Sequence, residues 1–236
     1  MTVATATILL CAGGTGGHLF PAESLAYALR ARGVRVVLAT DARVDSIATG
    51  FPASEIVTIA SATPSGRSPI RRAGALLTLG RGFGVAAREI RRIDPAAIVG
   101  FGGYPTVPPM LAGQILRVPT ILHEQNAVMG RANRFLARRV GRIAAGIPQD
   151  EAPQDLRDKI VVTGNPVRPA VLEAAKTPYR PSGSGEAFNL VVFGGSQGAA
   201  FFSQILPEAI SLLEPSVRGR LRVTQQARTD DGRTVA

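Results

Sequence analysis

The sequence predicts an α/β protein built on a mostly parallel β-sheet with helices on both faces. Short apolar runs rich in Val, Ile and Leu alternate along the chain with longer segments of helical period. Gly or Pro bounds these runs, as is typical of strand ends. Alternating strands and helices favour parallel pairing, because each crossover places a helix over the sheet.

The composition of the 236-residue chain is that of a folded globular protein. Apolar residues make up 45% and charged residues 19%, far from the values of disordered chains. The single cysteine, Cys11, excludes an intrachain disulfide, and with two histidines no metal site is expected. No apolar run approaches the ~20 residues of a membrane-spanning helix. We expect the N-terminal stretch to form a first strand rather than a signal peptide.

Seven strands and four long helices are expected in the first part of the chain. The strands are residues 7–12, 34–39, 56–59, 97–101, 119–122, 142–145 and 160–163. The helices are residues 21–32, 70–93, 106–117 and 128–139. Four glycines within residues 70–93 argue for a break in that helix.

The last third of the chain repeats a pattern seen at its start. After a short helix beyond Arg168, residues 177–189 have the composition of a linker. Residues 190–200 then resemble residues 8–18: an apolar strand, two glycines, Thr or Ser, and another glycine. Two tandem Rossmann-like domains, residues 1–167 and 168–236, are the economical interpretation, with chance similarity as the alternative. The second domain is expected to be incomplete, because it holds about two strands and one long helix.

The glycine loop from Gly13 to His18 follows a buried strand and opens a helix. Glycines let the backbone approach a ligand, and the helix N-terminus favours an anion, so a diphosphate fits this loop. The dinucleotide fingerprint is not met, because Leu19 stands where a third glycine is required, and no Walker Gly-Lys-Ser/Thr follows. A tight turn without a ligand is the alternative. Further glycine pairs at 102–103 and 194–195 favour a ligand crevice.

Both histidines follow predicted strands. His18 closes the glycine loop and is a candidate general base for a substrate hydroxyl. His123, beside a strand, is more simply a packing or capping residue. Glu124 and Asn126 either contribute a carboxylate and an amide to the same crevice or cap the helix that follows.

The net charge of +10 is concentrated in two arginine-rich stretches, residues 67–92 and 131–142. Such stretches favour acidic partners: nucleic acid, anionic lipid or a phosphorylated substrate. Within residues 70–92, apolar residues recur at helical spacing with arginines off that stripe, which predicts peripheral attachment to an anionic membrane. A core-facing stripe with a solvated face is the alternative.

Five motifs in this order and spacing resemble glycosyltransferase family 28: GGTGGH at 13–18, FGGYPTVPP at 101–109, HEQN at 123–126, GNPVR at 164–168 and GGSQGA at 194–199. The resemblance covers the whole chain. It implies a GT-B arrangement of two Rossmann-like domains facing a cleft. It also implies inverting transfer of N-acetylglucosamine from UDP-N-acetylglucosamine to the 4-hydroxyl of undecaprenyl-diphosphate-linked N-acetylmuramyl pentapeptide, at the cytoplasmic face of the bacterial plasma membrane.

The resemblance also implies site residues. Donor sugar and phosphate contacts fall on Gly14, Thr15, Gly16, Gly17 and Asn126, and the UDP side on Arg168, Ser196 and Gln197. His18, Tyr104 and Glu124 line the acceptor cleft, with His18 and Glu124 as the catalytic candidates. No metal or cofactor is implied, and the absence of Asp-x-Asp disfavours a metal-clamped diphosphate. The later donor-domain motifs of the family have no counterpart in this sequence.

Three alternatives remain open. A nicotinamide oxidoreductase would need a third fingerprint glycine and an acidic residue after the second strand, for which Asp41 is the nearest candidate. A nucleic-acid-binding module would need aromatic residues among the arginines, where only Phe83 and Phe135 occur. An inactive fragment that binds only the lipid-linked acceptor is the third.

Overall fold

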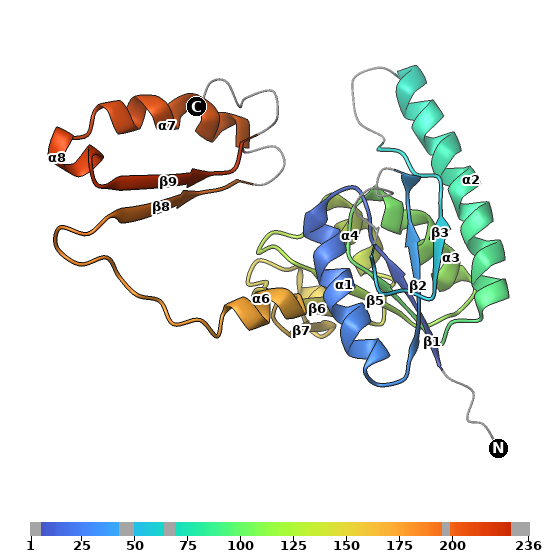
Figure 1. Cartoon of the computed structure of the whole chain (residues 1–236). Helices are drawn as coiled ribbons and strands as arrows, with labels where there is room; N and C mark the ends of the chain where they lie inside the picture. The colour runs from blue at the N-terminus through green and yellow to red at the C-terminus, as the bar shows by residue number, and fades with distance from the viewer. Residues whose placement is uncertain (1–5, 43–49, 64–68, 195–198, 228–236) are drawn as a thin grey trace. The chain divides into compact units, whose positions relative to one another are not determined.

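The computed structural model describes residues 6–42, 50–63, 69–194 and 199–227. The chain divides into two compact units, Met1–Ala175 and Lys176–Ala236 (Figure 1). Each unit has its own sheet.

The first unit contains a seven-stranded parallel sheet in the order β3-β2-β1-β4-β5-β6-β7. The strands are β1 (Thr7–Cys11), β2 (Arg35–Thr40), β3 (Glu55–Thr58), β4 (Ala97–Gly100), β5 (Thr120–Glu124), β6 (Arg142–Ala145) and β7 (Ile160–Val162). The central strand β1 pairs on both sides, with Leu9 opposite Val37 of β2 and Ile98 of β4. The parallel sheet and all seven predicted strands are confirmed.

Helices connect these strands. They are α1 (Gly16–Arg30), α2 (Pro69–Ile93), the 3-10 helix η2 (Tyr104–Thr106), α3 (Val107–Ile115), α4 (Arg131–Ala137), α5 (Gln154–Arg157) and α6 (Pro169–Ala174). Helix α1 begins five residues before its predicted start at Pro21, because Gly16 and Gly17 adopt helical geometry. Pro21 therefore lies one turn inside the helix, where its missing N–H removes a single backbone hydrogen bond.

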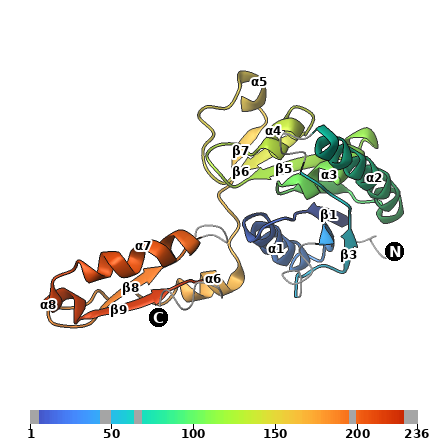
Figure 2. The same ribbon diagram turned by 90° about the horizontal axis from the view of Figure 1, so that it is seen from above.

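Helices cover both faces of the sheet (Figures 1 and 2). Leu10 and Val36 point to the face covered by α1, where they pack with Leu19 and Ala26. The alternate residues, such as Leu9, point to the opposite face, where α2, α3 and α4 supply the core. Because both faces are buried, the strands are almost continuously apolar. Among the described residues, no helix is both long enough and apolar enough to cross a membrane.

The predicted break in the helix at residues 70–93 is wrong, because α2 runs unbroken from Pro69 to Ile93. Its glycines differ in surroundings. A Cβ on Gly82 would overlap the carbonyl oxygen of Ala60, so glycine lets the helix approach the chain after β3. A Cβ on Gly74, Gly80 or Gly84 would meet nothing within 4 Å. At those positions glycine costs only helix propensity, which the packing of α2 against the core offsets.

The second unit contains one strand–helix–strand unit. Its elements are β8 (Phe188–Val192), α7 (Ala199–Ser211), α8 (Pro215–Arg218) and β9 (Leu221–Gln225), and β8 pairs with β9 in parallel. Among its described residues only Ser203 is buried, and large apolar side chains such as Phe193 and Leu212 are exposed. The short helix α6, which the sequence-based division places in the second domain, lies in the first unit.

The strand order creates a topological switch in the first unit. From β1 the chain runs outward through β2 and β3, and α2 then returns it to β4 on the other side of β1. In open parallel sheets, ligands bind beyond the carboxyl ends of the strands at such a switch. The loops after β1, β4 and β5 meet there.

Candidate functional site in the first unit

A pocket of about 250 Å³ lies at the carboxyl ends of β1, β4 and β5. It is lined by His18, Gly102, Gly103, Tyr104, Glu124, Asn126, Gly130, Arg131, Ala132 and Asn133. The structure thus brings together four residues that the sequence analysis selects: His18, Tyr104, Glu124 and Asn126.

The glycine loop before His18 forms a close turn into α1. Gly14 has φ +83°, a conformation that favours glycine. A Cβ on Gly13 would lie 3.0 Å from Pro105 and 3.1 Å from Thr40 Oγ1, so the loop packs tightly at its base. Thr15 is extended and precedes the helix without a capping hydrogen bond from its side chain. The first N–H groups of a helix lack partners within it, so the start of α1 suits an anion.

His18 lies in the first turn of α1, and its ring rests on the glycine pair after β4. A Cβ on Gly102 would lie 3.1 Å from His18 Cε1, and one on Gly103 would lie 3.3 Å from Cδ2. Both glycines have positive φ, +99° and +76°. A ligand crevice is predicted at this pair, and the structure gives a specific reason for glycine at both positions: side chains at 102 or 103 would crowd the imidazole.

Glu124 is 1% exposed and accepts four hydrogen bonds. Oε1 accepts from the backbone N and Nδ2 of Asn126, both at 3.0 Å. Oε2 accepts from Gly130 N at 3.0 Å and Asn133 Nδ2 at 2.9 Å. A buried carboxylate is tolerated when such donors surround it. The contacts tie loop 124–130 to α4, which is what a positioning role requires, so the catalytic role of Glu124 stays a prediction.

Asn126 presents its side chain at the rim of the pocket, and its backbone is also held. Gln149, from the loop after β6, donates from Nε2 to the Asn126 carbonyl oxygen at 2.6 Å. Asn165, from the GNPVR segment, donates to the Gln125 carbonyl oxygen at 3.2 Å. Two separate segments, the loop after β6 and the GNPVR segment, therefore hold the backbone of this loop.

His123 packs away from the pocket and is 4% exposed. Its ring lies 5.4 Å from that of Phe101, and Nε2 lies 3.4 Å from the Gly164 carbonyl oxygen. Desolvation by burial lowers the pKa of His123, although the hydrogen bond to Gly164 and the charge of Glu124 oppose the shift. A neutral, packed imidazole matches the packing role considered for this residue.

Arg168 lies beside the glycine loop. Its guanidinium carbon is 3.9 Å from the centroid of the Phe20 ring, and a Cβ on Gly16 would lie 2.8 Å from that same ring. The arginine therefore places a cation near the start of α1. Ser196 and Gln197, the other residues predicted for the UDP side, lie outside the described residues.

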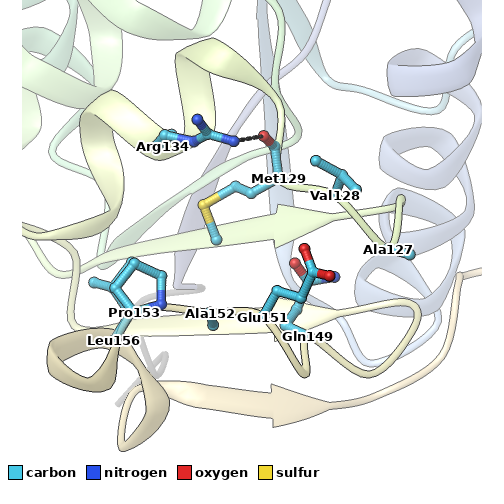
Figure 3. A pocket seen from close by; sticks show the side chains of 9 residues that line it. All are labelled: Ala127, Val128, Met129, Arg134, Gln149, Glu151, Ala152, Pro153 and Leu156. Carbon is cyan, nitrogen blue, oxygen red and sulfur yellow. Dashed lines mark hydrogen bonds between the residues drawn. The ribbon is translucent and has the colours of Figure 1, made fainter.

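A second cavity, of about 290 Å³, lies behind loop 124–130 (Figure 3). Its lining mixes apolar side chains such as Val128, Met129 and Leu156 with Arg134, Gln149 and Glu151. Arg134 Nη2 donates to the Met129 carbonyl oxygen at 3.4 Å, the bond drawn in Figure 3. This cavity therefore borders the same loop whose other side forms the pocket.

The described residues contain no group of three or more His, Cys, Asp or Glu side chains that could hold a metal ion. Cys11 is buried within β1, and desolvation raises the pKa of its thiol. It is not placed to act as a nucleophile.

Two polar residues at the site, Gln125 and Asn133, are not predicted from the sequence. Gln125 lies inside the HEQN motif and hydrogen-bonds to both histidines. Asn133 is 2% exposed in α4 and lines the pocket, and its Oδ1 accepts no hydrogen bond from the described residues. A polar residue among the buried positions of an apolar helix face is a signal that could have revealed Asn133.

Comparison with known proteins identifies the family of this chain. Residues 8–145 match the family described as "Glycosyltransferase family 28 N-terminal domain". A curated relative from Methylobacterium radiotolerans, named "UDP-N-acetylglucosamine--N-acetylmuramyl-(pentapeptide) pyrophosphoryl-undecaprenol N-acetylglucosamine transferase", is 71% identical over 98% of this chain. One from Methylorubrum populi with the same name is 66% identical. The chain spans 63% of the length of each.

Solved structures show the same fold. The crystal structure of Acinetobacter baumannii MurG aligns with a TM-score of 0.68 at 25% identity, covering 98% of this chain and 64% of that one. CalG4, the calicheamicin glycosyltransferase, aligns with a TM-score of 0.59 at 14% identity, covering 95% and 71%. The family match extends over more than half of the sequence, from β1 to β6, and includes the pocket and its three loops. The chain therefore belongs to glycosyltransferase family 28.

Proposed function

We propose that this chain supplies the acceptor side of an inverting transferase that moves N-acetylglucosamine from UDP-N-acetylglucosamine to an undecaprenyl-diphosphate-linked N-acetylmuramyl pentapeptide. The observation that carries the proposal is the pocket at the sheet switch, where His18 lies directly after a helix N-terminus suited to diphosphate. The names of the relatives supply the donor and the acceptor.

The proposed reaction is a single displacement. His18 takes the proton of the acceptor 4-hydroxyl, and the oxygen forms a bond to C1 of N-acetylglucosamine. The bond from C1 to the UDP oxygen breaks, and its electron pair leaves with UDP. The N–H groups at the start of α1 and the guanidinium of Arg168 stabilise diphosphate charge on this side of the site. Tyr104 orients the acceptor in the pocket, and Asn126 contacts the donor sugar and phosphate.

A transfer assay tests the proposal in two proteins: this chain, and a chimera in which this chain is joined to the part of the Methylobacterium radiotolerans relative that it does not cover. Labelled UDP-N-acetylglucosamine and a lipid-diphosphate-linked muramyl peptide are the substrates. We expect transfer by the chimera and none by this chain. By calorimetry, this chain alone should bind UDP-N-acetylglucosamine only weakly, roughly millimolar or worse, because a few exposed phosphate contacts seldom offset the freedom lost on association. An inactive, folded chimera would contradict the transferase proposal.

The chimera also tests the role of His18. His18→Ala should lower turnover about 100-fold or more with a smaller effect on substrate affinity. If turnover stays near normal from about pH 6 to 9, His18 is a positioning residue and not the base. The helical Gly84→Ala variant, whose Cβ meets nothing within 4 Å, is the matched control and should keep full activity.

We also propose peripheral attachment to an anionic membrane through the exposed side of α2, whose first half carries exposed apolar residues. Ile70, Leu76 and Leu77 are 83%, 61% and 67% exposed. In the second half of the helix, by contrast, Ala86, Ala87 and Ile90 are buried in the core, so the predicted stripe is core-facing there. Exposed apolar residues beside cations form the two-signal arrangement of membrane-surface proteins.

Arginines on the solvent side of α2 supply the charge for this attachment. Arg81 and Arg88 are exposed. Arg92 forms ion pairs with Glu55 and Glu89, which neutralise its charge, so it contributes less to attraction by anionic lipid. An apolar pocket of about 270 Å³ between α2 and α4, lined by Leu76 and Phe135 among others, continues the patch toward Tyr104.

Vesicle sedimentation tests the membrane proposal. Arg81→Glu and Arg88→Glu should each weaken pelleting with anionic vesicles at least about fivefold, because each removes an arginine that contributes about 1 kcal/mol near such a surface and adds a repelled carboxylate. Leu76→Ser with Leu77→Ser should weaken it as well. Arg30→Glu, on the helix that covers the opposite face of the sheet, is the matched control. Equal pelleting with neutral and anionic vesicles would contradict the proposal.

A further inference from the structure

The side chain of Gln125 lies between the two histidines of the chain. Its Nε2 is 3.0 Å from the Phe101 carbonyl oxygen, 3.0 Å from His123 Nδ1 and 3.3 Å from the His123 carbonyl oxygen. Its Oε1 is 3.3 Å from His18 Nδ1. One amide therefore joins the imidazole of the pocket to the buried imidazole behind it.

The surroundings decide which way this amide points. Two carbonyl oxygens face one end of it, and carbonyl oxygens only accept hydrogen bonds. The NH₂ group must occupy that end, because the opposite orientation would place three oxygens together without a proton. The amide oxygen is thereby turned toward His18, and it too can only accept.

This orientation assigns the protons on both rings. His18 Nδ1 must carry a proton in order to donate to Gln125 Oε1. His123 Nδ1 must accept from Gln125 Nε2, so the proton of neutral His123 is on Nε2, where it is donated to the Gly164 carbonyl oxygen. The two histidines are held in opposite tautomers by a single side chain.

We propose that Gln125 is a positioning residue that holds neutral His18 in the Nδ1–H tautomer and so makes Nε2 the proton acceptor of the site. This inference rests on the proposed function for its catalytic consequence. Nε2 has no hydrogen-bond partner among the described residues, and the ring lines the pocket. After Nε2 takes the proton of the acceptor hydroxyl, the imidazolium still donates from Nδ1 to Gln125 Oε1, which stabilises the new charge.

Nuclear magnetic resonance on this chain tests the tautomers without any substrate. The sequence contains two histidines, so a long-range ¹H–¹⁵N spectrum at about pH 8, where unperturbed histidine is neutral, contains two imidazole patterns. His123→Gln assigns them. We expect the Nδ1–H pattern for His18 and the Nε2–H pattern for His123. Free neutral histidine favours Nε2–H in water, so the pattern of His18 is the diagnostic one.

Gln125→Met is the decisive variant, because methionine has a similar length and no amide. We expect His18 to change to the Nε2–H pattern while the backbone spectrum shows that the fold is kept. Gln149→Met is the matched control: Gln149 binds the Asn126 carbonyl oxygen of the same loop and touches neither histidine. It should leave the His18 pattern unchanged. An Nε2–H pattern for His18 in the unaltered chain, or no change in Gln125→Met, would overturn the proposal.

The active chimera separates this inference from the proposed function. Gln125→Met should lower kcat about 100-fold, as expected for the loss of a correctly placed base, and leave KM for the donor within about threefold. A tautomer change with unaltered kcat would overturn the catalytic consequence and the base role of His18, while the assignment of the protons would stand. A chimera without activity that shows the expected patterns would count only against the proposed function.

Discussion

At the scale of single residues, the site depends on two glycines as much as on its polar side chains. Gly102 and Gly103 make room for the ring of His18, and both have backbone conformations that other residues rarely adopt. Around them the carboxylate of Glu124 and the amide of Gln125 use almost all of their hydrogen-bonding capacity on the protein itself. The position of His18 is thus set by its neighbours before any ligand binds.

Gly102→Ala should destabilise the first unit and displace His18. The positive φ costs about 1–3 kcal/mol for a residue with a side chain, and the new Cβ lies 3.1 Å from the imidazole. Gly33→Ala is the matched control, because Gly33 also has a positive φ, +75°, with nothing within 4 Å of the added Cβ. Urea unfolding should show a lower free energy of unfolding in both variants. The imidazole signals of His18 should change in Gly102→Ala alone, and a change in both would contradict the crowding argument.

The buried imidazole of His123 makes the stability of the first unit depend on pH. Its pKa in the folded state lies below the ordinary 6.5, so between these two values the unfolded chain binds more protons. The free energy of unfolding should therefore decrease as the pH falls below 6.5, by at most about 1.4 kcal/mol per pH unit for one proton. His123→Gln should flatten this part of the profile in urea unfolding at several pH values. An equal slope in that variant would show that another group is responsible.

At the scale of elements, α2 combines two roles that the sequence pattern does not separate. Its second half packs Ala86 and Ile90 into the core, while its first half leaves Leu76 and Leu77 exposed. Gly82 lies between these halves, where the helix comes closest to the chain after β3.

Two glycine variants of α2 should have opposite effects. Gly82→Ala should lower the free energy of unfolding by about 1–3 kcal/mol, because the methyl group would overlap the Ala60 carbonyl oxygen and force the helix outward. Gly84→Ala should raise it by about 1 kcal/mol, since it adds helix propensity in open space. Thermal unfolding of the two variants beside the unaltered chain measures this difference. Similar shifts in both would show that Gly82 does not limit the approach of the helix.

The strands were predictable because a buried parallel strand is apolar on both faces and ends at Gly or Pro. The start of α1 and the continuity of α2 were not, because tertiary packing outweighs the low helix propensity of glycine there. At the site, the motifs indicated His18 and Glu124. The place of Gln125 depends on three loops that meet only in the folded sheet, so sequence spacing could not reveal it.

At the scale of the whole molecule, the two units differ in how much of a core they contain. The first has apolar clusters on both faces of its sheet. In the second, the described residues include no buried apolar side chain, and its two strands and α7 leave Phe193, Phe201 and Leu212 exposed. Two paired strands with one helix are marginal on their own.

Hydrogen-exchange rates should therefore differ between the two units. Amides of β1, β4 and β5 should exchange only through global unfolding, whereas those of β8 and β9 should exchange at least about 100-fold faster, because a sheet without a core opens easily. Mass spectrometry of peptides from the intact chain measures both in one sample. Equal protection of β8 and β1 would contradict this expectation.

The position of β1 in the middle of the sheet has a consequence for synthesis on the ribosome. Ile8 pairs with Ala97, so 97 − 8 = 89 residues separate the partners. At roughly 5–20 residues per second, β4 leaves the ribosome roughly 4–18 seconds after β1. During that interval one edge of β1 is unpaired and its apolar side chains lack α3, so the nascent chain exposes apolar surface of the kind that chaperones bind. The same strand order that creates the pocket delays its assembly until β5 and α4 have emerged.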